Sequence, residues 1–291
     1  MRKFSFRAEF YKMYKSRGFK VLCIVAILLG LLNVVMNNVI NEEFLSKSLG
    51  TQVSEEQMES LINNDSDEII SPGSLGFHTG GAKDPFNITA VEAFHVSFGS
   101  GIMEILIAVL VGTMVAKEYS EGTIKNTLAY GKNRTSFYIA KFINIIAGSA
   151  IIMAIMTGVT TLGVIITKGW GEQFKFTQLI HMVETFLGAV IVFGAVAAII
   201  MVISSLVKSN GATIGISVAL FILLPTMASF LYGVYDWFDK IYELSLFYNS
   251  ALVTAIKASL QDVIRSMVIG VVTMAIALGT GITIFRSQDI K

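Results

Sequence analysis

The chain has 291 residues, of which 54% are hydrophobic and 15% are charged, and its formal net charge is +1. A soluble domain carries roughly 25% charged residues, so this composition indicates a protein that lies mostly in lipid. The small net charge gives no support for a nucleic-acid partner, and the single cysteine, Cys23, excludes a disulfide within one chain. We therefore expect an all-α membrane protein with six transmembrane helices.

The first segment, residues 1–18, is basic and amphipathic. One face of a helix here would carry Phe6, Phe10, Met13 and Tyr14. The opposite face would carry Ser5, Glu9, Lys12 and Ser16. This pattern is typical of a helix that lies in the membrane interface, with its basic groups towards anionic headgroups. The alternative is a basic flank that only orients the first span.

Residues 19–40 form the first expected span, which at about 1.5 Å per residue is long enough for a hydrocarbon core of about 30 Å. Asn33 and Asn37 lie four residues apart, on one face of its outer half. Lipid would leave their amides without hydrogen-bond partners, so we expect them to face another helix or a substrate pathway. The alternative places Asn37 and Asn38 simply at the outer interface.

Residues 41–92 form the long polar segment of the chain. It is rich in Asp and Glu, and its only basic residues are Lys47 and Lys83, which is typical of an extracellular segment. Ser54 and Gln57 form a capping-box pattern that predicts a short helix over residues 55–63. The segment is interpreted as a lid over the outer exit, a recognition surface for a cationic substrate, or a solvated loop.

The second expected span begins with Thr89 as a helix cap and runs on through Gly99 and Gly101 to its end near Tyr119. Glu104 lies inside this span. An ionisable side chain at that depth is costly and marks a candidate functional site. We expect Glu104 to be protonated, or paired with an asparagine amide of the first span. The alternative is a hydrogen bond that serves only helix packing.

Residues 117–141 form a charged loop between two long apolar runs. Its basic residues are Lys117, Lys125, Lys132, Arg134 and Lys141. Because Lys and Arg concentrate in cytoplasmic loops, we expect this loop inside the cell. Its front half predicts a short helix over residues 118–130, with Ser120 as a cap, Ile124 and Leu128 on one face, and Gly131 as a stop. A short amphipathic helix in a cytoplasmic loop indicates a segment that docks into a partner protein.

Four further spans are expected over residues 142–167, 184–207, 211–232 and 263–285. Gly211 and Gly215 form a G-x-x-x-G pattern that allows two helices to pack closely, so they are a candidate dimer seam. Pro225 should kink the fifth span. The aromatic, charge-broken residues 235–262 predict short or re-entrant helices before the sixth span. Six spans place both termini in the cytoplasm.

The sequence lacks several chemical signatures. It contains no G-x-x-x-x-G-K-[ST] phosphate-binding loop, so ATP binding by this chain is not expected. It contains no H-E-x-x-H pattern and no Cys/His cluster with metal-ligand spacing, so no metal site is expected. His181 and Glu184 are assigned no metal or proton role. We do not expect an enzyme.

The charged loop resembles a known family. The residues that carry the resemblance are Glu118, Glu121, Gly122, Thr123, Leu128, Arg134 and Lys141. They are similar to the E-x-x-x-G-T-x-x-x-x-L…R…K pattern of ABC-2 type transporter permeases. In that family the loop forms a coupling helix that docks into the ATP-binding subunit.

The resemblance implies a domain organisation and partners. Residues 1–18 would be the elbow helix and residues 19–291 the ABC-2 transmembrane domain, with 41–92 extracellular and 117–141 as the cytoplasmic coupling loop. A second permease copy, giving a homodimer, and two copies of an ATP-binding subunit are implied partners. ATP and Mg²⁺ would bind to that subunit, so no cofactor is expected in this chain. The residues expected to contact the ATPase are Glu118, Glu121, Gly122, Thr123, Leu128 and Arg134.

The leading hypothesis is the permease subunit of an ABC exporter in the plasma membrane. Its cargo would be antimicrobial, lantibiotic-like or toxin peptides, or drugs, which would link it to antimicrobial resistance. One alternative is an ion-coupled secondary transporter that uses Glu104; it predicts an internal repeat, which we do not find in the sequence. Another alternative is a membrane anchor or immunity protein that binds a toxin peptide through residues 41–92.

Overall fold

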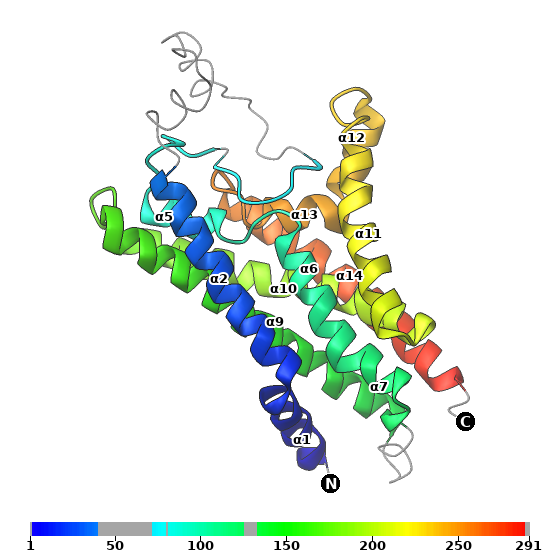
Figure 1. The fold of residues 1–291 in the computed structure, drawn as a ribbon. Coiled ribbons are helices and arrows are strands. Elements are labelled where there is room, and N and C mark those ends of the chain that lie inside the picture. Colours follow the sequence, from blue (N-terminus) through cyan, green and yellow to red (C-terminus); the bar gives the residue numbers. More distant parts are fainter. Residues whose placement is uncertain (1, 40–71, 80, 125–132, 289–291) are drawn as a thin grey trace.

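A computed structural model describes residues 2–39, 72–79, 81–124 and 133–288. These residues form a bundle of helices and connecting turns without a named strand, apart from one isolated antiparallel bridge between Gly76 and Ser100 (Figure 1). The helices in chain order are α1 (Arg2–Lys15), α2 (Arg17–Val39), α5 (Ala90–Val96), α6 (Ile102–Val111), the π-helix η1 (Gly112–Ala116), α7 (Lys117–Ser120), α9 (Arg134–Lys168), α10 (Phe176–Val207), α11 (Asn210–Ala228), α12 (Asp236–Glu243), α13 (Leu246–Leu252) and α14 (Leu260–Ser287).

Five helices in the described part of the chain are long and apolar enough to cross a membrane: α2, α9, α10, α11 and α14. They coincide with the first, third, fourth, fifth and sixth expected spans. The expected second span is divided among α6, η1 and α7, which follow one another directly in the chain. The all-helical membrane fold is therefore confirmed, whereas the count of six spans stays a prediction.

The expected continuous helix from Thr89 into the second span is wrong. Thr89 does cap α5, in a capping box with Glu92, but α5 ends at Val96 and α6 begins only at Ile102. Gly99 and Gly101 lie between them with φ angles of 59° and 76°. Such left-handed angles are incompatible with an α-helix, and glycine adopts them at little cost. The backbone of Ser100 is instead paired with Gly76 through two hydrogen bonds.

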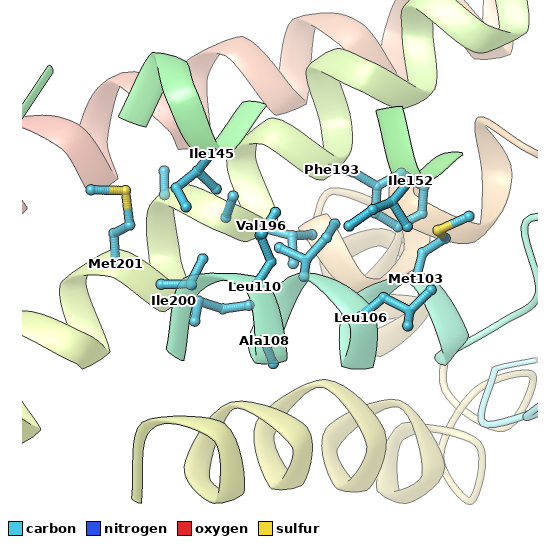
Figure 2. Packing of buried hydrophobic residues seen from close by; sticks show 14 of the residues in the cluster. Met103, Leu106, Ala108, Leu110, Ile145, Ile152, Phe193, Val196, Ile200 and Met201 are labelled. Carbon is cyan, nitrogen blue, oxygen red and sulfur yellow. The ribbon is translucent and has the colours of Figure 1, made fainter. Parts of the chain in front are cut away.

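The core lies where α6 packs between its neighbours. Met103, Leu106 and Leu110 of α6 are at most 5% exposed. They gather with buried side chains of α9, such as Ile152, and of α10, such as Phe193 (Figure 2). Among the candidate spans α10 is the most buried, while α11 and α14 are the least. The apolar outer faces of α11 and α14 are suited to lipid or to a second membrane helix.

Both ends of the described chain lie at one end of the bundle, beside α7, whereas α5, α12 and α13 lie at the other (Figure 1). We call these the α7 end and the α13 end. At the α7 end Arg134 donates hydrogen bonds to the carbonyls of Arg286 and Gln288. Gln288 in turn donates to the carbonyl of Ser205 at 2.7 Å. These bonds hold the start of α9 and the final turns of α10 and α14 together.

The short helices α12 and α13 confirm the prediction that residues 235–262 are not a simple span. Trp237 and Ile241 of α12 are more than 60% exposed, while Tyr242 is 8% exposed. The helix therefore has one buried edge and a large apolar surface. Pro225 lies inside α11 as expected, and α10 ends at Val207 in a tight turn where Lys208 has a φ of 55°.

Candidate functional site

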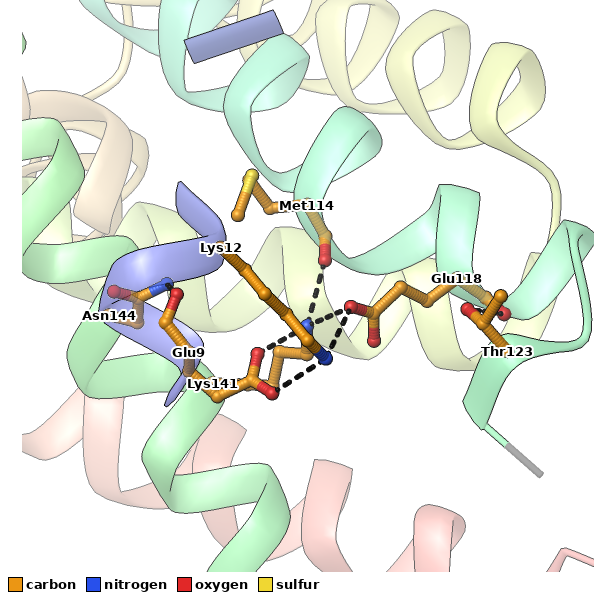
Figure 3. Close-up of polar contacts among 7 residues, drawn as sticks. All are labelled: Glu9, Lys12, Met114, Glu118, Thr123, Lys141 and Asn144. Atoms are coloured by element: carbon orange, nitrogen blue, oxygen red, sulfur yellow. Dashed lines mark hydrogen bonds and ion pairs between the residues drawn. The ribbon is translucent and has the colours of Figure 1, made fainter. Parts of the chain in front are cut away.

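Four charged side chains meet at the α7 end and form the candidate site. The Nζ atom of Lys141 lies 2.8 Å from Oε2 of Glu9 and 2.6 Å from Oε1 of Glu118 (Figure 3). It also donates a hydrogen bond to the carbonyl of Met114 at 3.2 Å. Lys141 is 3% exposed and Glu9 is 1% exposed. One ammonium group from α9 therefore binds α1, η1 and α7 at once.

The fourth member is Lys12, which lies nearer the surface. Its Nζ atom is 3.1 Å from Glu9 and 3.7 Å from Glu118, and its side chain is 48% exposed. The group thus holds two ammonium and two carboxylate groups, so its charges balance. We call these four residues the elbow cluster. Asn144 adds a hydrogen bond from its amide to the carbonyl of Glu9 at 3.2 Å.

The cluster favours the ionised forms of Glu9 and Lys12. Burial alone would raise the pKa of the Glu9 carboxyl, but the ammonium groups of Lys141 and Lys12 outweigh burial and hold that pKa below its ordinary value. Burial would likewise lower the pKa of Lys12, but the carboxylates of Glu9 and Glu118 outweigh it and raise that pKa. Buried charges are tolerated in proteins when they are paired in this way.

One residue of α1 lies differently from the expected pattern. Glu9, assigned to the face towards headgroups, is buried in the bundle, while Phe10 and Tyr14 of the apolar face are 40% and 63% exposed, as side chains that face lipid would be. Met13 is fully buried, and a Cβ atom on Gly148 would lie 2.8 Å from its sulfur. The absence of a side chain at Gly148 lets α1 approach α9 closely. Glu9 and Met13, four residues apart, therefore face the bundle together.

The helix expected over residues 118–130 also differs. Ser120 is the last residue of α7, and its hydroxyl donates to the carbonyl of Lys117 rather than capping a new helix. Gly122 follows with a φ of 67°, which ends α7. The backbone is helical again at Thr123 and at the next residue. Residues 125–132, including the Leu128 position, lie outside the described part of the chain.

The predicted ATPase-contacting residues divide into two groups. Glu118 is 18% exposed and bound by Lys141, and Arg134 is bound to carbonyls at the end of α14. The side chain of Glu121 is 54% exposed, and its Oε1 atom lies 3.6 Å from the Nζ atom of Lys117, one turn earlier in the helix. Thr123 is also exposed. Glu121 and Thr123 are thus presented to solvent, while Glu118 and Arg134 organise this end of the bundle. Their role in contacting an ATPase stays a prediction.

The predicted pathway residues are not gathered at one place. Asn37 donates to Asn33 at 2.5 Å, and its carbonyl accepts a hydrogen bond from Lys168. Glu104 accepts a hydrogen bond from Ser250 of α13 at 3.0 Å. The expectation that Glu104 pairs with an asparagine of the first span is therefore wrong in this structure, because α13 supplies a nearer donor.

The predicted dimer seam lies on an open face of α11. A Cβ atom on Gly211 or Gly215 would meet nothing within 4 Å, whereas one on Gly112 of η1 would lie 2.6 Å from Ile214. Ile214 thus packs against η1, and the two glycines of α11 lie on another side. Their role in a dimer stays a prediction. Within the described ranges, no group of three or more His, Cys, Asp or Glu side chains is arranged to hold a metal ion.

Three important residues were missing from the predicted site: Glu9, Lys12 and Lys141. Glu9 is the only acidic residue among the first twenty, and Lys141 is the last charged residue before the apolar run of α9. Each of these two features is a weak signal: a single acid in a basic segment, and a lysine at the edge of a span. Considered together, they would have suggested an ion pair between Glu9 and Lys141.

Comparison with known proteins gives a family-level match. Residues 4–290 match the family model described as "ABC-2 family transporter protein". The "Uncharacterized protein YhcI" of Bacillus subtilis (strain 168) is 24% identical over 152 residues. That match covers 47% of this chain and 48% of the Bacillus protein, so the chain aligns with about half the length of this relative.

Proposed function

Because the chain belongs to the ABC-2 transporter family, we propose that it is the permease subunit of an ATP-driven exporter in the plasma membrane. The family match over residues 4–290 favours this function over a secondary transporter and over an immunity protein. The cargo we propose is hydrophobic or amphipathic: peptides or drugs. The apolar, exposed surface of α12, with Trp237 and Ile241, would suit such cargo near the α13 end.

The elbow cluster is the observation that carries the proposal. It joins α1, the η1–α7 segment and α9 through buried charges, so a force on the loop after α7 reaches three helices together. Packed elements of this kind move between discrete arrangements rather than deforming continuously. An ATPase that closes on nucleotide binding would move the elbow and the third span as one unit. The free energy for this movement comes from the different affinities of its nucleotide states for the two arrangements.

The proposed orientation places the α7 end in the cytoplasm. Basic residues gather at this end of the bundle: Lys12, Lys15, Arg17, Lys117, Arg134, Lys208 and Arg286. An excess of Lys and Arg is typical of the cytoplasmic side. With the α6–η1–α7 segment as the second of six spans, both termini lie on this side. Residues 41–92 then lie outside the cell.

The proposed assembly contains two copies of this chain and two ATP-binding subunits. The exposed glycines of α11, Gly211 and Gly215, would let a second copy approach closely. ATP and Mg²⁺ would be bound by the ATP-binding subunits.

The test is co-purification of the tagged full-length chain with an ABC ATP-binding protein from its native membranes. We expect Glu121→Lys to reduce recovery of the ATPase by at least about tenfold, because it places the wrong charge at an exposed contact. The matched control is Glu172→Lys, an exposed acid 42% accessible in the turn between α9 and α10, which should leave recovery unchanged. Failure of the unmodified chain to recover any ATP-binding protein would refute the proposal.

A further inference from the structure

A small cavity at the α13 end is lined by five parts of the fold: the segment before Gly76, α6, α11, α12 and α13. Its main lining side chains are Glu104, Phe221, Pro225, Tyr242, Phe247 and Ser250. The open space measures about 30 Å³, which holds about two water molecules. It is therefore large enough for a group the size of an ammonium ion.

The cavity contains a carboxylate with unused hydrogen-bonding capacity. Glu104 is only 8% exposed, and its Oε1 atom accepts a hydrogen bond from Ser250 at 3.0 Å. Its Oε2 atom is buried and has no hydrogen-bond partner. An unsatisfied buried acceptor is costly, and its presence in a native site calls for an unseen partner.

A second acceptor belongs to α11, which also borders the cavity. Pro225 lies inside α11 and has no N–H group. The carbonyl of Phe221, four residues earlier, therefore lacks the donor that a regular helix would supply. Phe221 and Pro225 both line the cavity. Both α6 and α11 thus bring an acceptor group to residues that line the cavity.

The remaining lining favours a positive charge. Aromatic rings of Phe221, Tyr242 and Phe247 border the space, and aromatic rings attract cations. Among the described residues that line the cavity, none is Lys, Arg or His. An acid and three aromatic rings therefore border a space whose described lining holds no basic side chain.

We propose that this cavity binds the primary ammonium group of an amphipathic cargo molecule, with Glu104 as its counter-ion and the Phe221 carbonyl as a second acceptor. The assignment of the ammonium group to cargo rests on the proposed export function, but its binding does not require an ATPase. An ammonium group has three N–H donors, which match Glu104 Oε2, the Phe221 carbonyl and the aromatic border. The uncharged part of the cargo would extend along the exposed apolar surface of α12.

The surrounding fold keeps the cavity narrow. A Cβ atom on Gly73 would lie 2.9 Å from the backbone of Thr226, and one on Gly101 would lie 2.5 Å from Leu75. The segment over residues 72–75 therefore lies directly on α6 and α11. A narrow site of this kind selects a slim primary ammonium over a bulky quaternary one.

The experiment measures thermal stability of the full-length chain in lipid nanodiscs during titration with n-butylammonium chloride. Ligands that bind only the folded state raise Tm with a saturating dependence on concentration. We expect such a rise for the wild type and none with n-butanol or with NaCl at equal ionic strength. Glu104→Gln should weaken the apparent affinity by about tenfold or more, because it removes the counter-ion.

Two further variants separate binding from folding. Ala251 also lines the cavity, so Ala251→Leu should fill the space and abolish the response while Glu104 remains. Glu184→Gln changes an acid of α10 that does not line the cavity, and it should respond like the wild type. An equal response in Glu104→Gln and the wild type, no saturable response in the wild type, or an equal effect of NaCl would overturn the proposal. Intact butylammonium binding without ATPase co-purification would instead refute only the export function.

Discussion

The elbow cluster leads to a quantitative prediction for Lys141→Met. The substitution keeps most of the length of the side chain but removes the ammonium group that Glu9 and Glu118 share. Glu9 is 1% exposed, so its carboxylate cannot turn to solvent without undocking α1. Lys12 remains, but it is 48% exposed and offers only partial compensation.

The expected cost is about 3–5 kcal/mol, the usual penalty for leaving one member of a buried ion pair unpaired. Lys117→Met is the matched control. Lys117 pairs with Glu121, but both side chains are more than half exposed, so this pair should contribute roughly 0–1 kcal/mol. The double variant Glu9→Gln with Lys141→Met removes both buried charges, and we expect it to be more stable than Lys141→Met alone.

The measurement is the free energy of unfolding in mixed detergent micelles, followed by far-UV circular dichroism. Release of α1 can be followed in parallel by limited proteolysis of the first residues. A Lys141→Met protein as stable as the Lys117→Met control would refute the reasoning. The reasoning would also be refuted if the loss of unfolding free energy in the double variant equalled the sum of the losses in Glu9→Gln and Lys141→Met. In that case the two charges would not interact.

Further predictions concern helix packing and pH. A Cβ atom on Gly163 would lie 2.4 Å from a methyl group of Val34, whereas one on Gly158 would meet nothing within 4 Å. We therefore expect Gly163→Ala to lower the free energy of unfolding by about 1–3 kcal/mol, because it overpacks α2 against α9. The control Gly158→Ala should not lower it. Equal losses in the two variants would contradict the close contact between α2 and α9. Since the pKa of Glu9 is depressed on folding, its stabilisation is present above pH 4.5 and is lost as the pH falls through the lower folded value. The Tm difference between the wild type and Glu9→Gln should therefore shrink on acidification below that point, and a constant difference would argue against the ion pair.

The long helices could be predicted from the sequence because each is marked by a continuous apolar run within its own residues. Each of α2, α9, α10, α11 and α14 is an uninterrupted apolar run of sufficient length, and in lipid such a run satisfies its own backbone hydrogen bonds only as a helix. The cap at Thr89 was equally local and was also predicted.

The features that were missed depend on residues distant in the chain. The break before α6 follows from the pairing of Ser100 with Gly76, and the glycines of that segment alone did not reveal it. Glu104 and Ser250 are 146 positions apart. The pattern of α1 defines a polar face, but it cannot distinguish a face towards lipid headgroups from one towards a buried lysine. Only the position of Lys141 decides between them.

The π-helix η1 has a mechanical consequence for the rod that joins the Glu104 cavity to the elbow cluster. A π-helix closes each hydrogen bond over one residue more than an α-helix does, and within it Thr113 donates its hydroxyl to the carbonyl of Val109. Because η1 links α6 to α7 without a break in the chain, a rotation of α7 about the helix axis would have to pass through this wide turn before it reached Glu104.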